Sequence, residues 1–239
     1  MLVLEDGQAL QFSELRTRFA LEHSSARRKA SVTFDRNFHI FQSPKFQSVV
    51  NDAINFFAET PVHRLPPPQP FLGSGVYGLY FMGNYELYAS IARVNRDACS
   101  QPIYIGKAVP QGWRTGRSIG MQRQDLYKRL REHARSIQQV VNLQVDDFQC
   151  RFMILAEIES DLVVPVEAEL IRRYKPLWNT VIDGFGNHDP GSGRYNQARS
   201  PWDILHPGRP WVERLTGESQ SIEVVVARIQ KFLGQSDLS

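Results

Sequence analysis

Apolar side chains recur along the chain at two spacings, which separate expected helices from expected strands. After Ser43-Pro44, a pair suited to a helix start, apolar residues follow at the 3.6-residue period of one buried helix face as far as Phe57. The same period predicts further helices over 14–22 (the weaker one), 124–140, 165–174 and from Ser221 onward. Pro165 would stand in the first turn of its helix, where proline is tolerated.

Shorter runs of aromatic and β-branched side chains predict strands. The runs Gly75–Phe81 and Tyr85–Ile91, separated by Met82-Gly83-Asn84, favour a β-hairpin. Ile103–Ile105, ended by a glycine, favours a third strand, and Phe148–Ile158 a fourth. This mixture predicts an α/β chain of the α+β type, with a small mixed or antiparallel sheet flanked by helices.

Proline and glycine mark the expected divisions of the chain. Residues 66–70, Pro-Pro-Pro-Gln-Pro, fit neither a helix interior nor a central strand and predict a stiff boundary. Residues 175–211 have little periodicity, but their aromatic residues favour an ordered loop: Trp178, Phe185, Tyr195, Trp202 and Trp211. We expect a helical N-terminal region (1–70) packed on a core (71–182), followed by a loop-rich extension and C-terminal helix (183–239).

The composition is that of a folded protein, with 42% hydrophobic and 22% charged residues. No apolar run is long enough to cross a membrane, and the first residues do not resemble a secretory signal. The two cysteines, Cys99 and Cys150, lie in neither a CxxC motif nor a Cys/His cluster. These features favour a cytoplasmic protein with reduced thiols and no membrane segment.

Positive charge is concentrated in one segment. The net charge of the chain is only +3, yet residues 107–135 hold eight basic side chains against two acidic ones. Such a concentration is expected where phosphates are neutralised. A solvated basic helix face would have the same charge, so charge alone leaves both interpretations open.

Several residues are candidates for chemistry, although each alone has an ordinary explanation. Tyr77 and Tyr104 stand on predicted strands, where core aromatics are common. Arg129 and His133 lie four positions apart on one helix face, where surface pairs are common. Glu167, near a helix start, could act only on the helix dipole. Their order along the chain is what changes this picture.

Five short motifs, in order, resemble those of the GIY-YIG nuclease family. They are Gly75-Val76-Tyr77, Tyr104-Ile105-Gly106, Leu-Tyr-Lys-Arg-Leu-Arg-Glu-His at 126–133, Val-Glu-Ala-Glu-Leu-Ile at 166–171 and Lys-Pro-Leu-Trp-Asn at 175–179. Val76 replaces the isoleucine of the family name, a change of apolar volume that should not affect chemistry. The resemblance covers residues 75–179, and five ordered motifs are more specific than any one of them.

Within that family the sequence is most similar to the type II restriction endonucleases, notably the branch that cuts the palindrome CCGCGG. This similarity rests on His133, the insertion at 107–114, the extension at 183–191 and the helical N-terminal region. The resemblance implies hydrolysis of double-stranded DNA with Mg²⁺ (or Mn²⁺) to give 5′-phosphate ends, and a companion DNA methyltransferase. Cutting both strands of a palindrome with one site per chain favours a homodimer.

Two other functions are compatible with the same core. One is a structure-selective repair or homing nuclease, and the other is a non-catalytic DNA-binding module. Repair and homing nucleases usually have additional helix-hairpin-helix or zinc modules, and no such segment is recognisable in this sequence. The non-catalytic alternative is disfavoured because every catalytic position of the family is filled.

The resemblance, together with side-chain chemistry, assigns the metal site to Glu167. One carboxylate suits Mg²⁺, a hard ion that prefers oxygen ligands and keeps most of its waters. Glu169 is the alternative, but it lies two positions later on a different helix face and does not align with the family motif. Asn179, otherwise an ordinary turn residue, would fix the Glu167 helix or the adjacent loop by amide hydrogen bonds.

The remaining roles concern protons and the phosphate. Tyr77 is the candidate general base, although its phenol pKa, ordinarily about 10, would have to be lowered by the metal or by Lys107. His133, in its neutral form, would accept a proton from Tyr77 or hydrogen-bond to it. Tyr104 would orient water or phosphate, and Arg129 would present its planar guanidinium to the scissile phosphate.

Nine residues are candidate DNA contacts: Lys107, Arg114, Arg117, Arg123, Lys128, Arg131, Arg194, Gln197 and Arg199. Arginine and glutamine hydrogen-bond to guanine and adenine edges, but phosphate contacts are the alternative for each of them. The two lysines and Arg131 are expected on phosphates. For His188 and Asp189, a structural or DNA-contact role is favoured over a second metal site.

Overall fold

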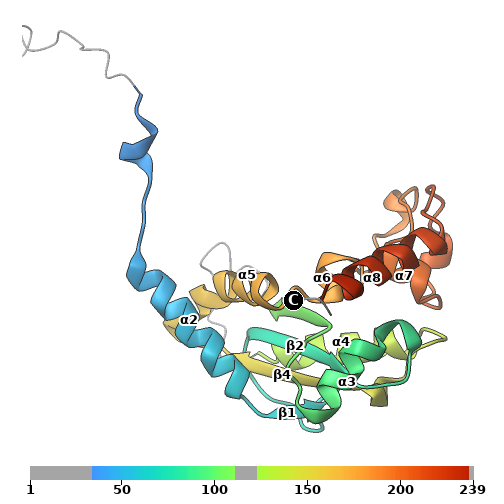
Figure 1. Cartoon of the computed structure of the whole chain (residues 1–239), viewed down its shortest axis with the longest axis horizontal. Helices are drawn as coiled ribbons and strands as arrows, with labels where there is room; N and C mark the ends of the chain where they lie inside the picture. Colours follow the sequence, from blue (N-terminus) through green and yellow to red (C-terminus); the bar gives the residue numbers. More distant parts are fainter. Residues whose placement is uncertain (1–33, 111–122, 237–239) are drawn as a thin grey trace, which may run out of the picture. The chain divides into compact units, whose positions relative to one another are not determined.

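The computed structural model describes residues 34–110 and 123–236 (Figure 1). The predicted helix at 14–22 and the candidates Arg114 and Arg117 lie outside these residues. The chain divides into two compact units, Met1–Ser43 and Pro44–Ser239. In the first, the described residues contain the 3-10 turn η1 (Arg36–His39). The elements described below belong to the second unit.

A four-stranded antiparallel sheet forms the centre of the second unit, as predicted. Its order is β1 (Val62–Arg64), β4 (Phe148–Ile154), β2 (Gly75–Phe81) and β3 (Tyr104–Ala108). Every residue of β2 is buried because β2 pairs on both sides and both of its faces are covered. β3 is an edge strand.

Helices cover both faces of the sheet (Figure 1). They are α2 (Pro44–Glu59), α3 (Ala89–Asp97), α4 (Asp125–Gln138), α5 (Val163–Tyr174), α6 (Leu177–Thr180), α7 (Pro201–Leu205) and α8 (Ile222–Ser236). Short 3-10 turns are η2 (Glu86–Tyr88), η5 (Val145–Asp147), η6 (Glu157–Leu162), η7 (Ser192–Arg194) and η8 (Val212–Arg214). The predicted helices that fall within the described residues are confirmed within a few positions.

Alternation along β2 divides the core into two clusters, because successive strand residues point to opposite faces. Tyr77, Leu79 and Phe81 belong to the larger cluster, with residues of α3, α4, α6, α7 and α8. Val76 belongs to the smaller cluster, with residues of α2 and α5. Tyr77 and α5 are thus assigned to opposite faces of the sheet.

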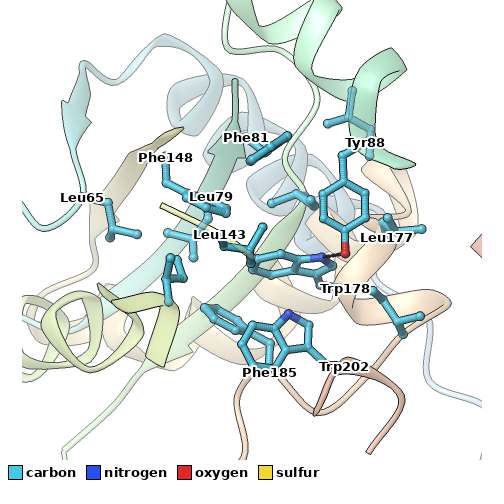
Figure 2. Packing of buried hydrophobic residues seen from close by; sticks show 14 of the residues in the cluster. Leu65, Leu79, Phe81, Tyr88, Leu143, Phe148, Leu177, Trp178, Phe185 and Trp202 are labelled. Atoms are coloured by element: carbon cyan, nitrogen blue, oxygen red, sulfur yellow. Dashed lines mark hydrogen bonds between the residues drawn. The ribbon is translucent and has the colours of Figure 1, made fainter. Parts of the chain in front are cut away.

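The segment after residue 175 closes the larger cluster, which confirms the expected ordered loop. Trp178, Phe185 and Trp202 are fully buried, with ring centroids 4.6–5.6 Å apart (Figure 2). Trp178 Nε1 donates a hydrogen bond to the Tyr88 hydroxyl at 3.0 Å. This bond replaces the one to water that the Trp178 indole N–H loses on burial.

The predicted β-hairpin of Gly75–Phe81 and Tyr85–Ile91 is wrong, since its second segment forms η2 and the start of α3. Buried Tyr88, Ile91, Ala92 and Asn95 follow the spacing of one helix face, not the alternation of a strand. The position beside β2 is taken instead by β3 and β4. Local aromatic content was therefore a misleading signal.

Strand ends also differ from the sequence prediction. β3 continues through Gly106 to Ala108, because this glycine pairs with Tyr77 of β2. β4 ends at Ile154, where its pairing with β2 ends, and η6 follows within the segment predicted as strand. The proline-rich segment 66–70 connects β1 to β2 within one sheet, although the sequence had suggested a boundary there.

Across residues 34–110 and 123–236, no helix has the length and apolar character needed to span a bilayer.

Candidate active site

A buried tyrosine–histidine pair forms the centre of the site. Tyr77 on β2 is 0% exposed and His133 on α4 is 2% exposed, and the phenol oxygen lies 2.6 Å from His133 Nε2. Burial raises the pKa of the Tyr77 phenol and lowers the pKa of His133 well below its usual value. With both groups neutral, the tautomer protonated at Nδ1 accepts the phenol O–H at Nε2.

Gly106 makes room for the Tyr77 phenol. The two residues are cross-strand partners, and a Cβ added at Gly106 would lie 2.4 Å from the phenol oxygen. Any other residue at position 106 would therefore displace the hydroxyl. Tyr104, two residues earlier on β3, packs edge-on against His133, with ring centroids 5.2 Å apart. The second motif thus supplies both the space and the second phenol.

Arg129 lies one helical turn before His133 on α4. Its Nη2 donates to the carbonyl of Gly186 at 3.0 Å, and its Nη1 donates to Glu132 at 3.0 Å and contacts His188 Nε2. Burial raises the pKa of Tyr104 as well as that of Tyr77, and the guanidinium charge opposes this in both. Arg129 is therefore the cation placed to favour a phenolate at this site.

Glu167 on α5 forms an ion pair with Lys107 on β3. Their side chains are 16% and 31% exposed, so the carboxylate is accessible to small ligands. After burial, the Glu167 charge is a further cause that raises the pKa of Tyr77 and Tyr104. The candidate residues therefore meet around the edge strand β3, with the phenols and Glu167 approaching it from different faces.

The donor set fits a hard divalent cation held by one carboxylate. Among residues 34–110 and 123–236, no three His, Cys, Asp or Glu side chains form a metal-binding group. Mg²⁺ commonly binds through one or two carboxylates and keeps several waters. At Glu167, the Lys107 ammonium already places a positive charge on the carboxylate. Glu169, the alternative ligand, is instead paired with Arg172.

Asn179 holds the edge of the sheet. Its side-chain amide accepts from the backbone N–H of Ile105 and donates to the carbonyl of Ile105, both at 2.8 Å. Ile105 stands between Tyr104 and Gly106, so this clamp fixes the second motif in place. The sequence analysis expected bonds to the Glu167 helix or the adjacent loop, and the structure places them on β3.

The candidate DNA contacts around α4 are mostly exposed. Lys128 and Arg131 lie on the solvent side of the helix, and the Arg131 guanidinium lies 5.8 Å from the centre of the Tyr127 ring. Arg123, just before the helix, pairs with Asp125. Lys107, on β3, is less exposed than these residues and forms an ion pair with Glu167.

The candidates in the late loop lie apart from α4 in the sequence. Arg194 and Gln197 are exposed and line a polar hollow that also includes His188 and Asp189. Arg199 pairs with Glu213. Asp189 accepts hydrogen bonds from the Gly191 backbone, Tyr195 and Arg214. These bonds are typical of a loop-forming residue, which is one of the two roles, structural or DNA contact, predicted for Asp189.

Arg209 has a buried guanidinium in the C-terminal extension and is not among the residues predicted from the sequence. It pairs with Asp203 and donates to the carbonyls of Gly184, Phe185 and Asn187. Neither residue of the ion pair belongs to a recognised motif, and the segment has little periodicity. No local signal in the sequence identifies this group, since its partners become neighbours only in the fold.

A second buried tyrosine–histidine pair predicts how stability depends on pH. The Tyr88 hydroxyl lies 2.6 Å from His206 Nε2, and burial lowers the pKa of His206 to about 3. In the unfolded chain His206 binds a proton below about pH 6.5, whereas in the folded chain the His206 imidazole stays neutral down to much lower pH. Stability from this group is therefore lost as the pH falls below 6.5.

We expect the His206 contribution to the free energy of unfolding to fall by about 2 kcal/mol between pH 7 and pH 5. Urea unfolding of the wild type and of His206→Gln at both pH values measures it. The variant should lose about 2 kcal/mol less than the wild type over this range. Equal losses would show that His206 does not stay neutral in the folded chain.

A model of the Eco29kI GIY-YIG domain family matches residues 69–233. The match runs from before β2 into α8 and includes the two tyrosines, Arg129, His133, Glu167 and Asn179. No curated protein matches the chain.

Proposed function

Because the chain belongs to the Eco29kI GIY-YIG family of restriction endonucleases, we propose that it is a type II enzyme that cuts both strands of DNA at a short palindrome. The observation that carries this proposal is the meeting of two phenols, a guanidinium, a neutral imidazole and an accessible carboxylate around β3. A GC-rich target similar to CCGCGG is proposed from the family resemblance alone.

Phosphodiester hydrolysis needs a water that loses a proton, positive charge on the phosphate and a proton for the leaving oxygen. The hydrogen bond between Tyr77 and His133 suits the first task. As water attacks phosphorus, its proton passes to the Tyr77 oxygen while the Tyr77 proton passes to His133 Nε2. The P–O bond to the attacking oxygen forms as the bond to the 3′-oxygen breaks, and the leaving 3′-oxygen takes a proton from solvent water, which gives a 5′-phosphate and a 3′-hydroxyl.

Burial leaves both members of this pair neutral before substrate arrives. The lowered pKa of His133 keeps its Nε2 unprotonated, so it can accept the phenol proton at neutral pH. Because burial also raises the pKa of Tyr77, a free phenolate is disfavoured before substrate arrives. Proton transfer through the hydrogen bond avoids that phenolate as a resting state.

Arg129 and Glu167 supply the charge. The planar Arg129 guanidinium has five N–H donors, so it can bind phosphate oxygens while Gly186 and Glu132 hold part of it. Glu167 would hold Mg²⁺ or Mn²⁺, which would supply positive charge for the phosphate and would acidify water. With a cation on Glu167, the Lys107 ammonium would be free to contact a DNA phosphate.

The exposed basic side chains of α4 are proposed as phosphate contacts. Within the described residues, no side-chain hydrogen bond or ion pair holds Lys128 or Arg131 away from DNA, and both lie on the helix that carries Arg129. Phosphate contacts fix the position of the enzyme on the duplex without specifying sequence. Arg194 and Gln197 in the late loop are the proposed base contacts.

Binding to duplex DNA should depend steeply on salt, because each neutralised phosphate releases counterions. Replacing Lys128 and Arg131 together by glutamine should reduce the slope of log K against log salt by about 2. Fluorescence anisotropy with a cognate and a scrambled duplex measures it, and both duplexes should weaken equally. An unchanged slope would remove these residues from the interface.

Cleavage of a sequenced plasmid with Mg²⁺ tests the proposed function. We expect discrete fragments whose ends map to one short palindrome. Nicks confined to junctions or flaps would instead indicate a structure-selective nuclease, and retarded but uncut DNA would indicate a binding module.

Light scattering with the cognate duplex should give two chains per duplex, and one chain per duplex would contradict the proposed homodimer. Protection of the site by a methyltransferase is part of the same proposal.

A further inference from the structure

The Arg209 guanidinium is saturated with hydrogen bonds. Its Nε donates to Asp203 at 2.7 Å, its Nη1 to the carbonyls of Phe185 and Asn187 at 3.1 Å, and its Nη2 to the carbonyl of Gly184 at 3.0 Å. The side chain is 1% exposed. Three carbonyls of one short segment, residues 184–187, are therefore gathered on one planar fork.

Two tryptophans and an aspartate hold this guanidinium. Its central carbon lies 4.7 Å from the Trp202 ring and 4.8 Å from the Trp211 ring. Asp203, also buried, is fixed in turn by the Ser200 hydroxyl at 2.6 Å. Arginine suits such a place because its flat cation can contact aromatic rings while its edge donates hydrogen bonds.

The segment held by Arg209 contacts the candidate active site. The Phe185 ring stacks on His133, with centroids 4.5 Å apart and planes 19° apart, and meets Tyr104 edge-on at 5.0 Å. The carbonyl of Gly186 accepts from Arg129. Carbonyls of this segment thus face Arg209, while the Phe185 side chain and the Gly186 carbonyl face the groups proposed to move protons and bind phosphate.

Gly184 and Gly186 allow this close packing. Gly184 has a φ of 110°, which side-chain-bearing residues rarely adopt, and a Cβ there would lie 2.0 Å from the Ser200 hydroxyl. A Cβ at Gly186 would lie 2.8 Å from the Tyr104 hydroxyl and 3.3 Å from Arg129. Side chains at these two positions would therefore clash with Ser200 and with the site in the path that the segment takes beside Arg209.

A buried ion pair contributes little to stability when compared with well-packed apolar residues. The cost of burying Arg209 is thus better explained by the geometry it imposes. We propose that Arg209 is a positioning residue for DNA cleavage, which fixes residues 184–187 so that Gly186 aims Arg129 and Phe185 holds His133 against Tyr77. This inference rests on the proposed nuclease function.

Arg209→Lys tests the proposal, because lysine keeps the charge beside Asp203 but lacks the planar fork for three carbonyls. We expect the single-turnover cleavage rate at saturating enzyme to fall by about 10- to 100-fold, since a displacement of about 1 Å can cost about 10²-fold. The dissociation constant for duplex DNA should change by less than about threefold. A wild-type rate in a folded variant would overturn the proposal.

The matched control is Arg214→Lys. Arg214 pairs with the Asp189 side chain, two residues after the same segment, and donates to none of the carbonyls of residues 184–187. Its pair is exposed, so its rate should stay within about twofold of the wild type. A loss equal to that of Arg209→Lys would show that the rate responds to any perturbation near this loop, and would overturn the proposal.

A purely structural effect is separated in two further ways. Val225→Ala removes buried volume in α8, and at a temperature well below its melting point it should cut DNA at the wild-type rate despite lower stability. In an Arg129→Lys background, Arg209→Lys should have a smaller effect on the rate than alone, because part of its effect passes through the contact between Gly186 and Arg129. If the effects of Arg129→Lys and Arg209→Lys on the rate were fully additive, or if Val225→Ala cut DNA slowly, the positioning role of Arg209 would be contradicted.

An activity-independent measurement covers the case in which the chain cuts no DNA. The proton on His133 Cε1 is shifted by the ring current of Phe185, and this NMR resonance should move in Arg209→Lys without DNA but stay in place in Arg214→Lys. An inactive wild type would end the proposed function, whereas an unmoved resonance would end the positioning role. Arg209→Lys could fail to give a folded protein, and Trp211→Leu then serves as the second variant. It removes the partly exposed tryptophan ring that contacts the Arg209 guanidinium, and it should shift the same His133 resonance.

Discussion

Replacing Glu167 by glutamine should abolish DNA cleavage, with a fall in rate of about 10³-fold or more. The change removes the negative charge that fits a divalent cation while keeping the size of the side chain. It also leaves the Lys107 ammonium, which is 31% exposed, without its partner. Since that ammonium can be solvated, folding and DNA binding should be largely preserved. Cleavage assays over a range of Mg²⁺ concentrations, with circular dichroism and anisotropy, measure all three properties.

Glu169→Gln is the matched control for this experiment. It makes the same chemical change on the same helix two residues later, where the carboxylate pairs with Arg172 on the surface. Its cleavage rate should remain within about twofold of the wild type, because exposed ion pairs contribute little. Loss of activity in Glu169→Gln with normal turnover in Glu167→Gln would reverse the metal assignment. Equal losses in both would indicate a general effect of the helix charge.

Tyr77→Phe should reduce the cleavage rate by about 10²- to 10⁴-fold, the range for loss of a general acid or base. The ring and its packing are retained, and only the hydroxyl that bonds His133 Nε2 is removed. The unpaired imidazole nitrogen should lower the free energy of unfolding by about 1–3 kcal/mol. Single-turnover kinetics and urea unfolding measure the two effects separately. A wild-type rate would show that Tyr77 is not the proton acceptor.

Tyr88→Phe is an unusually close control, since it removes a hydroxyl from the other buried tyrosine–histidine pair of the described chain. The Tyr88 oxygen also lies 2.6 Å from a histidine Nε2, that of His206, and it accepts from the Trp178 indole. Stability should fall at least as much as in Tyr77→Phe, because two buried groups lose a partner. Cleavage well below the melting temperature should be unaffected. A slow Tyr88→Phe enzyme would mean that lost stability explains the Tyr77→Phe result.

Motif order along the chain gives Tyr77, Tyr104, Arg129, His133 and Glu167 as candidates, and the structure brings all five together around β3. Aromatic and β-branched content alone predicts a strand at Tyr85–Ile91, where η2 and the start of α3 are found. The sequence also predicts that β3 ends at Gly106, because a glycine inside a strand is usually a weak point. In this sheet that glycine is required by the cross-strand phenol.

The sequence by itself predicted most of the helices and strands and the candidate site residues, because hydrophobic period and motif order are local properties of the chain. Only the tertiary structure decided which groups are neutral and which are paired. The burial that keeps His133 unprotonated comes from elements distant in sequence, among them Phe185. The Asn179 clamp on Ile105 and the Arg209 fork on residues 184–187 likewise join distant segments. Such contacts have no local signature, since desolvation and hydrogen-bond geometry exist only once the chain is packed.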